Sequence, residues 1–360
     1  MTTSDWPQAD PTLERAYKRL LRAYPSGYRR RHEREIVTTL LEMAEPGQQR
    51  PARADVWHLL ASGVRQRFRL PAGRPLAWVF AVLALLIGGA LGAAAGSWAA
   101  TRTFAGVPDA AAGQALQRQI VGSPGIENHY HADSGSPWWD ETAWHDTQVQ
   151  GFGGWDPEQA RQNLAADGWQ LGEITHPPGK SATMDENGNT VELRTESNAF
   201  LAERDGVTLD IQGWTTEMYG SVTISMYPSG NAALLPLVVL GMLAGMAAGW
   251  LAAAALIQRA RQGAPGRARL AVALGTLTVL ALALPAVAFY GNVMRAFRYA
   301  GNDDPVFTVH SALRPGPYWP FGPEWLNLAL AGAGLVLLVA LVLTARVRPA
   351  PAAETQTVTS

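Results

Sequence analysis

Residues 76–100 read LAWVFAVLALLIGGALGAAAGSWAA, a long run without a single charged side chain. The hydrocarbon core of a bilayer is about 30 Å thick, so a helix that crosses it needs about 20 apolar residues. Three later stretches meet the same requirement, at residues 234–257, 270–290 and 326–345. Buried helices of soluble proteins rarely stay free of charge over this length. The sequence therefore predicts a mainly α-helical integral membrane protein with four transmembrane helices.

The distribution of arginine and lysine orients these helices. Residues 1–75 carry fourteen basic and eight acidic side chains, whereas residues 101–233 carry six basic and eighteen acidic ones. The loop at 258–269 holds four arginines and no acid, and the tail at 346–360 begins with two more. Segments rich in arginine and lysine stay in the cytoplasm. We therefore expect a multi-pass protein of the cell membrane with both termini in the cytoplasm, and the segments 101–233 and 291–325 outside.

The overall composition excludes several kinds of covalent and metal-binding chemistry. The chain has 360 residues, a net charge of -1 and no cysteine. Disulfides, thiolate catalysis and cysteine-ligated metal sites are thereby excluded, so a domain outside the membrane must be held together by packing. Arginine greatly outnumbers lysine, and alanine and glycine are abundant, as is typical of high-GC bacteria. We expect the small, polar tail at 346–360 to be disordered.

Two of the four apolar stretches share a glycine spacing. Small residues four positions apart form a groove on one helix face, which lets two helix backbones approach closely. The pattern predicts a helix–helix contact, either within one chain or between two chains of a homodimer, although a chain rich in glycine and alanine also produces such spacings by chance. The glycines are Gly88, Gly92 and Gly96 in the first stretch, and Gly241, Gly245 and Gly249 in the second.

Ionisable residues are absent from the middle of all four apolar stretches. Ion pumps and proton-coupled transporters usually keep Asp, Glu, Lys, Arg or His inside the helix bundle, where these residues form the transport pathway. Their absence argues against an autonomous ion pump and against a proton-coupled transporter.

Residues 1–75 are predicted to form a cytoplasmic helical bundle. Apolar residues recur at helical spacing over 13–24, 28–45 and 54–68, and segments with proline and glycine separate these runs. The block Arg29, Arg30, Arg31 and Arg34 has the charge to bind acidic lipid headgroups or a partner protein. With glutamates interleaved, it is more typical of a solvated helix face. No nucleic-acid recognition motif accompanies the arginines, so we expect no nucleic-acid partner.

The run Leu13–Arg30, which reads LERAYKRLLRAYPSGYRR, resembles the helical prefix of many actinobacterial membrane proteins, and so does Glu33–Gly47. Similar prefixes precede some ABC-type permeases. They also resemble the helix-bundle modules of membrane proteins that are often encoded beside PadR-like transcription regulators. The resemblance covers roughly the first 70 residues and implies no catalytic residue. The rest of the chain lacks the long, repeated architecture of a full permease.

The segment 101–233 is long enough to fold by itself, and its second half is the better patterned. Asp156-Pro157-Glu158 has the sequence of a helix start, with a capping aspartate and proline at the first helical position. Asn187-Gly188 and Asp205-Gly206 are hairpin signals. Apolar residues alternate with polar ones over 207–212 and again over 222–226. We expect an extracytoplasmic α+β domain, with one helix packed on a small antiparallel sheet.

The first half of this segment, up to about residue 154, has a helical pattern at 108–121 and is otherwise irregular. Its three histidines, His129, His131 and His145, have the chemistry to ligate a divalent metal together with Asp133 or Asp146. Histidines that alternate in an irregular acidic segment are usually solvated, so they stay weak candidates. Asp140 and Glu141, which lie beside tryptophans, resemble the carboxylates of a sugar-processing cleft, and passive ligand or glycan binding also stays open.

No serine-nucleophile elbow, phosphate loop or zinc-protease helix occurs in the sequence, so we expect neither an enzyme nor a cofactor. The architecture favours a signalling or transporter-accessory protein that couples an outside binding domain to the cytoplasmic helices. The alternative is a subunit of an ABC-type export complex, which would need a substrate route through four spans without polar residues. The expected partners are the lipid bilayer and, through residues 1–75, a cytoplasmic regulator or a transporter subunit.

Overall fold

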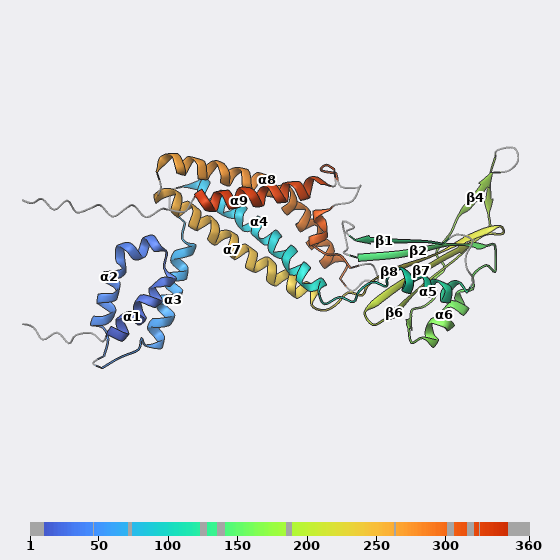
Figure 1. Cartoon of the computed structure of the whole chain (residues 1–360), viewed down its shortest axis with the longest axis horizontal. Coiled ribbons are helices and arrows are strands. Elements are labelled where there is room, and N and C mark those ends of the chain that lie inside the picture. The colour runs from blue at the N-terminus through green and yellow to red at the C-terminus, as the bar shows by residue number, and fades with distance from the viewer. Residues whose placement is uncertain are drawn as a thin grey trace, which may run out of the picture. The chain divides into compact units, whose positions relative to one another are not determined.

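The computed structural model describes residues 11–45, 47–70, 74–122, 128–134, 141–184, 189–262, 264–300, 306–314, 320–323 and 325–344. The chain divides into two units by its internal contacts. Unit 1 comprises Met1–Leu85, Ala247–Gly275 and Val339–Ser360, and unit 2 comprises Leu86–Met246 and Thr276–Leu338. Four long helices contribute residues to both units (Figure 1). The predicted disordered tail at 346–360 lies outside the described residues.

These four helices are α4 (Pro75–Thr101), α7 (Leu234–Gln262), α8 (Pro265–Arg298) and α9 (Trp325–Thr344). All are long and apolar enough to cross a membrane, in agreement with the four predicted spans. The predicted loops at 258–269 and 291–325 are shorter than expected, because α7 and α8 extend into them. The hydropathy pattern did not predict the additional helical turns at the ends of α7 and α8. Arginine is excluded from hydrocarbon, but it is a good helix former.

Unit 1 contains a helical module, which we define as residues 11–68. It consists of α1 (Pro11–Leu20), a short 3-10 turn η1 (Leu21–Ala23), α2 (Ser26–Glu42) and α3 (Arg53–Phe68). Its core is formed by Leu13, Tyr17, Leu21, Tyr24, Val37 and Leu59. The Tyr17 hydroxyl donates a hydrogen bond to Asp55 Oδ2 at 3.2 Å, and burial together with Asp55 raises the pKa of Tyr17. The predicted helices over 13–45 and 54–68 are thus present.

Unit 2 contains a sheet domain within residues 101–233. Its main sheet has six antiparallel strands in the order β1-β2-β8-β7-β6-β3. The strands are β1 (Asn128–Ser134), β2 (Glu141–Gln150), β3 (Gln170–Leu171), β6 (Glu196–Arg204), β7 (Val207–Thr215) and β8 (Tyr219–Pro228). A separate hairpin pairs β4 (Ser181–Met184) with β5 (Thr190–Leu193). Figure 1 shows α5 (Ala110–Val121) and α6 (Pro157–Ala166) on the same side of the main sheet.

Two of the local signals predicted in the second half of the segment 101–233 are present in the structure. Asp156 caps α6, because its Oδ1 accepts hydrogen bonds from the backbone N–H groups of Glu158 and Gln159. Asp205 and Gly206 both have positive φ, 53° and 77°, as the tight turn between β6 and β7 requires. The Asn187-Gly188 signal lies outside the described residues.

The domain is larger than the single helix on a small sheet that the sequence suggested. The helical pattern at 108–121 corresponds to α5, so two helices cover the sheet, and the stretch after it, which was expected to be irregular, forms β1 and β2. The inward side chains of β2 include His145 and Thr147, both fully buried. Since polar residues occupy inward positions, the strand lacks the apolar–polar alternation by which strands are recognised.

A polar cluster at one end of the unit 2 helices holds the loop that follows α8. Ser97 Oγ accepts a hydrogen bond from the Val309 backbone N–H at 2.9 Å, and Asn292 Nδ2 donates to the Thr308 carbonyl at 2.8 Å. Asn327 Nδ2 donates to a further loop carbonyl at 3.3 Å. All three side chains are buried. They satisfy backbone groups that water does not reach, which allows an irregular segment to pack between α4, α8 and α9.

Candidate functional site

The candidate site lies in unit 1, where the helical module meets α7. It begins with one face of α3, on which Leu59, Gly63 and Arg67 are spaced four residues apart. Leu59 is in the module core, and a Cβ on Gly63 would come within 2.7 Å of the Ala23 Cβ. Glycine at position 63 therefore lets α3 contact η1 directly. Arg67 donates from Nε to the carbonyl of Ala23 at 2.5 Å and from a terminal nitrogen to that of Arg22 at 2.7 Å.

The end of α3 is attached to the membrane-type helices of unit 1. The Trp250 indole Nε1 of α7 donates a hydrogen bond to the Phe68 carbonyl at 3.0 Å. Two residues further on, Leu70 is buried in a small cluster with Ala81 of α4 and with Ala253 and Ala254 of α7. The junction therefore combines one directed hydrogen bond with apolar packing, and both fix the position of the last turn of α3.

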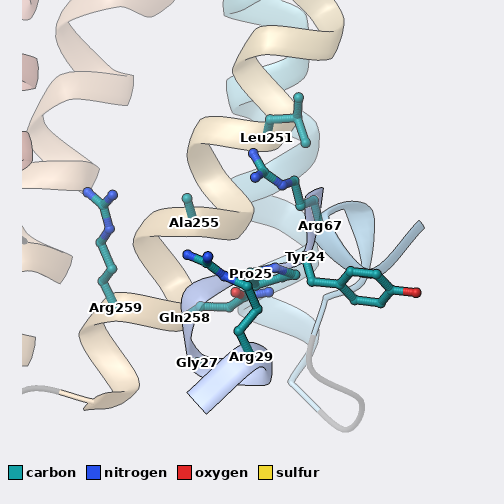
Figure 2. Close-up of a pocket in the computed structure, with 9 residues that line it drawn as sticks. All are labelled: Tyr24, Pro25, Gly27, Arg29, Arg67, Leu251, Ala255, Gln258 and Arg259. Carbon is teal, nitrogen blue, oxygen red and sulfur yellow. The ribbon is translucent and has the colours of Figure 1, made fainter. Parts of the chain in front are cut away.

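A cavity of about 290 Å³ opens beside this junction (Figure 2). Its walls come from the η1–α2 connection, from α2, from Arg67 of α3 and from α7. The lining residues are Tyr24, Pro25, Gly27, Arg29, Arg67, Leu251, Ala255, Gln258 and Arg259. The α7 members recur after four, three and one residues, which places them along a single helix face. Segments that are far apart in the sequence therefore build one cavity.

All charged side chains that line the cavity are positive. Three arginines line it, and none of the lining residues is acidic. Within the described part of the chain, no carboxylate lies within ion-pair distance of Arg29, Arg67 or Arg259. Arg29 is partly buried, and its Nε is enclosed without a hydrogen-bond partner among those residues. A cavity lined by three arginines and no acidic residue is suited to an oxyanion.

Of the predicted arginine block, only Arg29 lines the cavity. Arg30, Arg31 and Arg34 are exposed on α2, as expected for a solvated face. Sequence reasoning did not single out Arg67 or Arg259 as site residues. The available signal was weak: Arg259 is the first charged residue after an apolar stretch, and Arg67 is one of several arginines near the end of α3.

The two glycine rows meet each other inside one chain. In unit 2, a Cβ on Gly92 of α4 would overlap the carbonyl oxygen of Gly241 of α7. A Cβ on Gly245 would likewise overlap the carbonyl oxygen of Gly88. The backbones of α4 and α7 are thus in direct contact. Any side chain larger than hydrogen at these positions would prevent this close approach.

The contact extends beyond the central glycines in both directions. A Cβ on Gly96 would overlap the carbonyl oxygen of Leu237 in unit 2, and one on Gly249 would overlap that of Ala84 in unit 1. Every predicted helix-packing glycine therefore lies on the interface between α4 and α7. While this contact is intact, neither row is available to the same row of a second chain.

The histidines are not brought together. His131 on β1 pairs with Trp144 on β2, and the two rings stack with centroids 5.2 Å apart. His145 is the next residue along β2, so its side chain points to the opposite face of the sheet, where it is fully buried. One metal ion cannot be ligated by both. The side chain of His129 and residue Asp140 lie outside the described part of the structure.

The described residues also contain no cluster of three or more His, Asp or Glu that could hold a metal ion. Asp146, a predicted metal-ligand candidate, instead accepts hydrogen bonds from the hydroxyls of Ser221 at 2.6 Å and Thr223 at 3.1 Å. These bonds run across the open face of the sheet between β2 and β8. They give Asp146 a structural role in strand pairing.

Comparisons with protein-family models, with curated proteins and with solved structures found no match to this chain.

Proposed function

We propose that this chain is a membrane-spanning signalling or transporter-accessory protein of the cell membrane. In this proposal the sheet domain lies outside and binds an external ligand or protein, and the helical module lies in the cytoplasm and contacts a regulator or a transporter subunit. The four apolar helices cross the bilayer, and a change in the sheet domain reaches the module through α7.

The connection made by α7 is the observation that carries the proposal. Strand β8 ends at Pro228, and α7 begins at Leu234, only a short link later. From there α7 continues as one helix to Gln262. Its second half contains Trp250 and the alanines that hold the end of α3. The helix that receives the last strand of the sheet domain is therefore also the helix to which the module is attached.

The charge distribution supports the orientation. The ends of α7 and α8 that belong to unit 1 carry Arg259, Arg261, Arg267 and Arg269, whereas residues 101–233 are strongly acidic. Basic ends of this kind stay on the cytoplasmic side. The sheet domain, with its excess of carboxylates, is repelled from an anionic lipid surface and stays soluble beside it.

Separating α4 from α7 tests whether these helices transmit a change. Gly92→Ala forces the two backbones apart in unit 2, whereas Gly332→Ala in α9 places a methyl group in open space and is the matched control. Hydrogen exchange is measured at residues 53–68 in the full chain in lipid nanodiscs. We expect faster exchange in α3 for Gly92→Ala and unchanged exchange for Gly332→Ala.

A contrary result has a defined form. If Gly92→Ala alters exchange in α4 and α7 but leaves α3 as in the wild type, the helices do not couple the module to the rest of the chain. The module would then be a tethered domain, and the proposed function would be wrong.

A further inference from the structure

We propose that the arginine cavity binds a phosphate group, held between the beginning of α2 and the end of α7. This inference deepens the proposed function, since it names a ligand class for the place where the module is attached, and it rests on the proposed insertion of α7 in the membrane. The cavity as defined above is lined by Arg29, Arg67 and Arg259.

Arg67 and Arg29 are held in the cavity wall in different ways. Arg67 is fixed by its hydrogen bonds to the carbonyls of Ala23 and Arg22, so its charge stays at the cavity wall without an acidic partner. Arg29 is partly buried and lines the cavity, and no described carboxylate lies within ion-pair distance of its guanidinium group. A phosphate would supply the negative charge that these arginines lack there.

The beginning of α2 adds to the attraction. Pro25 and Gly27 line the cavity; Pro25 directly precedes this helix of 17 residues, and Gly27 lies in its first turn. Pro25 is the N-cap residue, and no side chain among the described residues caps the helix. The first N–H groups of a helix carry a partial positive charge that favours anions, above all phosphates. Two residues at this end of α2 therefore line the same cavity as the arginines.

The position along α7 indicates where the phosphate comes from. Leu251 and Ala255 lie in the last turns of the apolar stretch 234–257, whereas Gln258 and Arg259 follow directly after it. The cavity thus spans the boundary between apolar and charged residues, which is the level of the lipid headgroups. Basic pockets at the cytoplasmic ends of transmembrane helices are suited to phospholipid headgroups. A free phosphate ion is the other source with the same chemistry.

The test uses the full-length chain in detergent. Native mass spectrometry counts bound lipid after titration with phosphatidylglycerol or with phosphatidylcholine, and calorimetry follows titration with inorganic phosphate in a separate arm. We expect the wild type to retain phosphatidylglycerol in preference to phosphatidylcholine. Binding of inorganic phosphate without retention of either lipid would support the site and assign a free ion to it.

The double variant Arg29→Gln/Arg259→Gln is compared with Arg31→Gln/Arg267→Gln, which removes the same charge from exposed positions outside the cavity. Loss of two charge-assisted contacts predicts an affinity at least about tenfold weaker for the first pair only. Ala255→Leu keeps all charges and fills the cavity, and it should weaken binding as well. Thermal unfolding of each variant establishes that it is folded.

Two results would overturn the inference. One is that neither phosphatidylglycerol nor phosphate binds the wild type, and the other is that both arginine pairs lose binding equally, which would indicate general surface charge. These outcomes are separate from the coupling experiment, because binding in detergent does not depend on transmission through α4 and α7. If the chain binds phosphate but Gly92→Ala leaves exchange in α3 unchanged, the phosphate site would be supported and the proposed function would be wrong.

Discussion

The indole Nε1 of Trp250 donates a hydrogen bond to the backbone carbonyl of Phe68, over a distance of 3.0 Å. Phe68 is the last residue of α3, and Trp250 lies in the second half of α7. The Trp250 ring also meets the Trp78 ring of α4 edge-on, with centroids 5.7 Å apart. One side chain therefore joins three helices of unit 1, and tryptophan suits this position because it combines a large apolar ring with a hydrogen-bond donor.

Trp250→Phe removes the donor and keeps an aromatic ring. The net value of such a hydrogen bond is about 0.5–1.5 kcal/mol. We expect faster hydrogen exchange in the last turns of α3 and unchanged exchange in the sheet domain. Trp57→Phe changes an exposed tryptophan of the same module and is the control. Equal exchange in wild type and Trp250→Phe would mean that apolar packing around Leu70 alone attaches the module.

The sheet domain should lose stability in mild acid because of His145. This side chain is fully buried, its ring lies 4.9 Å from that of Tyr130, and a Cβ on Gly113 would be only 2.5 Å from its Nε2. Burial lowers the pKa of His145 from its ordinary value of 6.5. The unfolded chain thus takes up a proton near pH 6.5, whereas the folded chain does so only at lower pH. Stability falls as the pH drops through this interval and is restored above it.

Tryptophan fluorescence during thermal unfolding of the full chain, recorded between pH 7.5 and pH 5, measures this effect. His145→Gln is expected to flatten the pH dependence, since it removes the titrating group. His131→Gln changes an exposed histidine on the neighbouring strand and should leave the dependence intact. A His145→Gln chain that still loses stability over the same interval would show that other groups are responsible.

Asn292→Leu should destabilise the helices of unit 2. The substitution keeps the approximate size of the side chain but removes the donor to the Thr308 carbonyl, and Thr308 is itself buried. A buried carbonyl that loses its partner costs about 1–3 kcal/mol. The expected result is a lower midpoint of thermal unfolding in detergent. Met294→Leu on the same helix changes an exposed residue and should not shift the midpoint; an equal midpoint for Asn292→Leu would contradict the role given to the cluster.

Much of the fold could be predicted because local chemistry determines it. Four uncharged stretches correspond to four long helices, Asp156 caps α6, and Asp205-Gly206 makes the β6–β7 turn. Each of these depends on a few neighbouring residues. Strand β8 was equally readable, because Val222, Ile224 and Met226 alternate with polar residues and are fully buried.

Other parts of the fold and the cavity depend on contacts between distant residues, which no local sequence pattern predicts. Strand β2 was missed because His145 and Thr147 occupy its buried positions and hide the alternation. The turns of α8 beyond the apolar stretch were not predicted, because hydropathy identifies the part of a helix that can lie in the membrane and not the residue at which the helix ends. The cavity is lined by Arg29, Arg67 and Arg259, which come from segments distant in the chain, and no local pattern in the sequence predicts that they line one cavity.

The most direct test of the account is the side of the membrane on which each domain lies. The chain has no cysteine, so single cysteines can be placed at exposed positions, Thr38→Cys in the helical module and Thr190→Cys in the sheet domain. Spheroplasts are treated with a maleimide that does not cross membranes, before and after permeabilisation. We expect position 190 to react in intact spheroplasts and position 38 to react only after permeabilisation. Reaction of position 38 in intact spheroplasts, or protection of position 190, would contradict the proposed orientation.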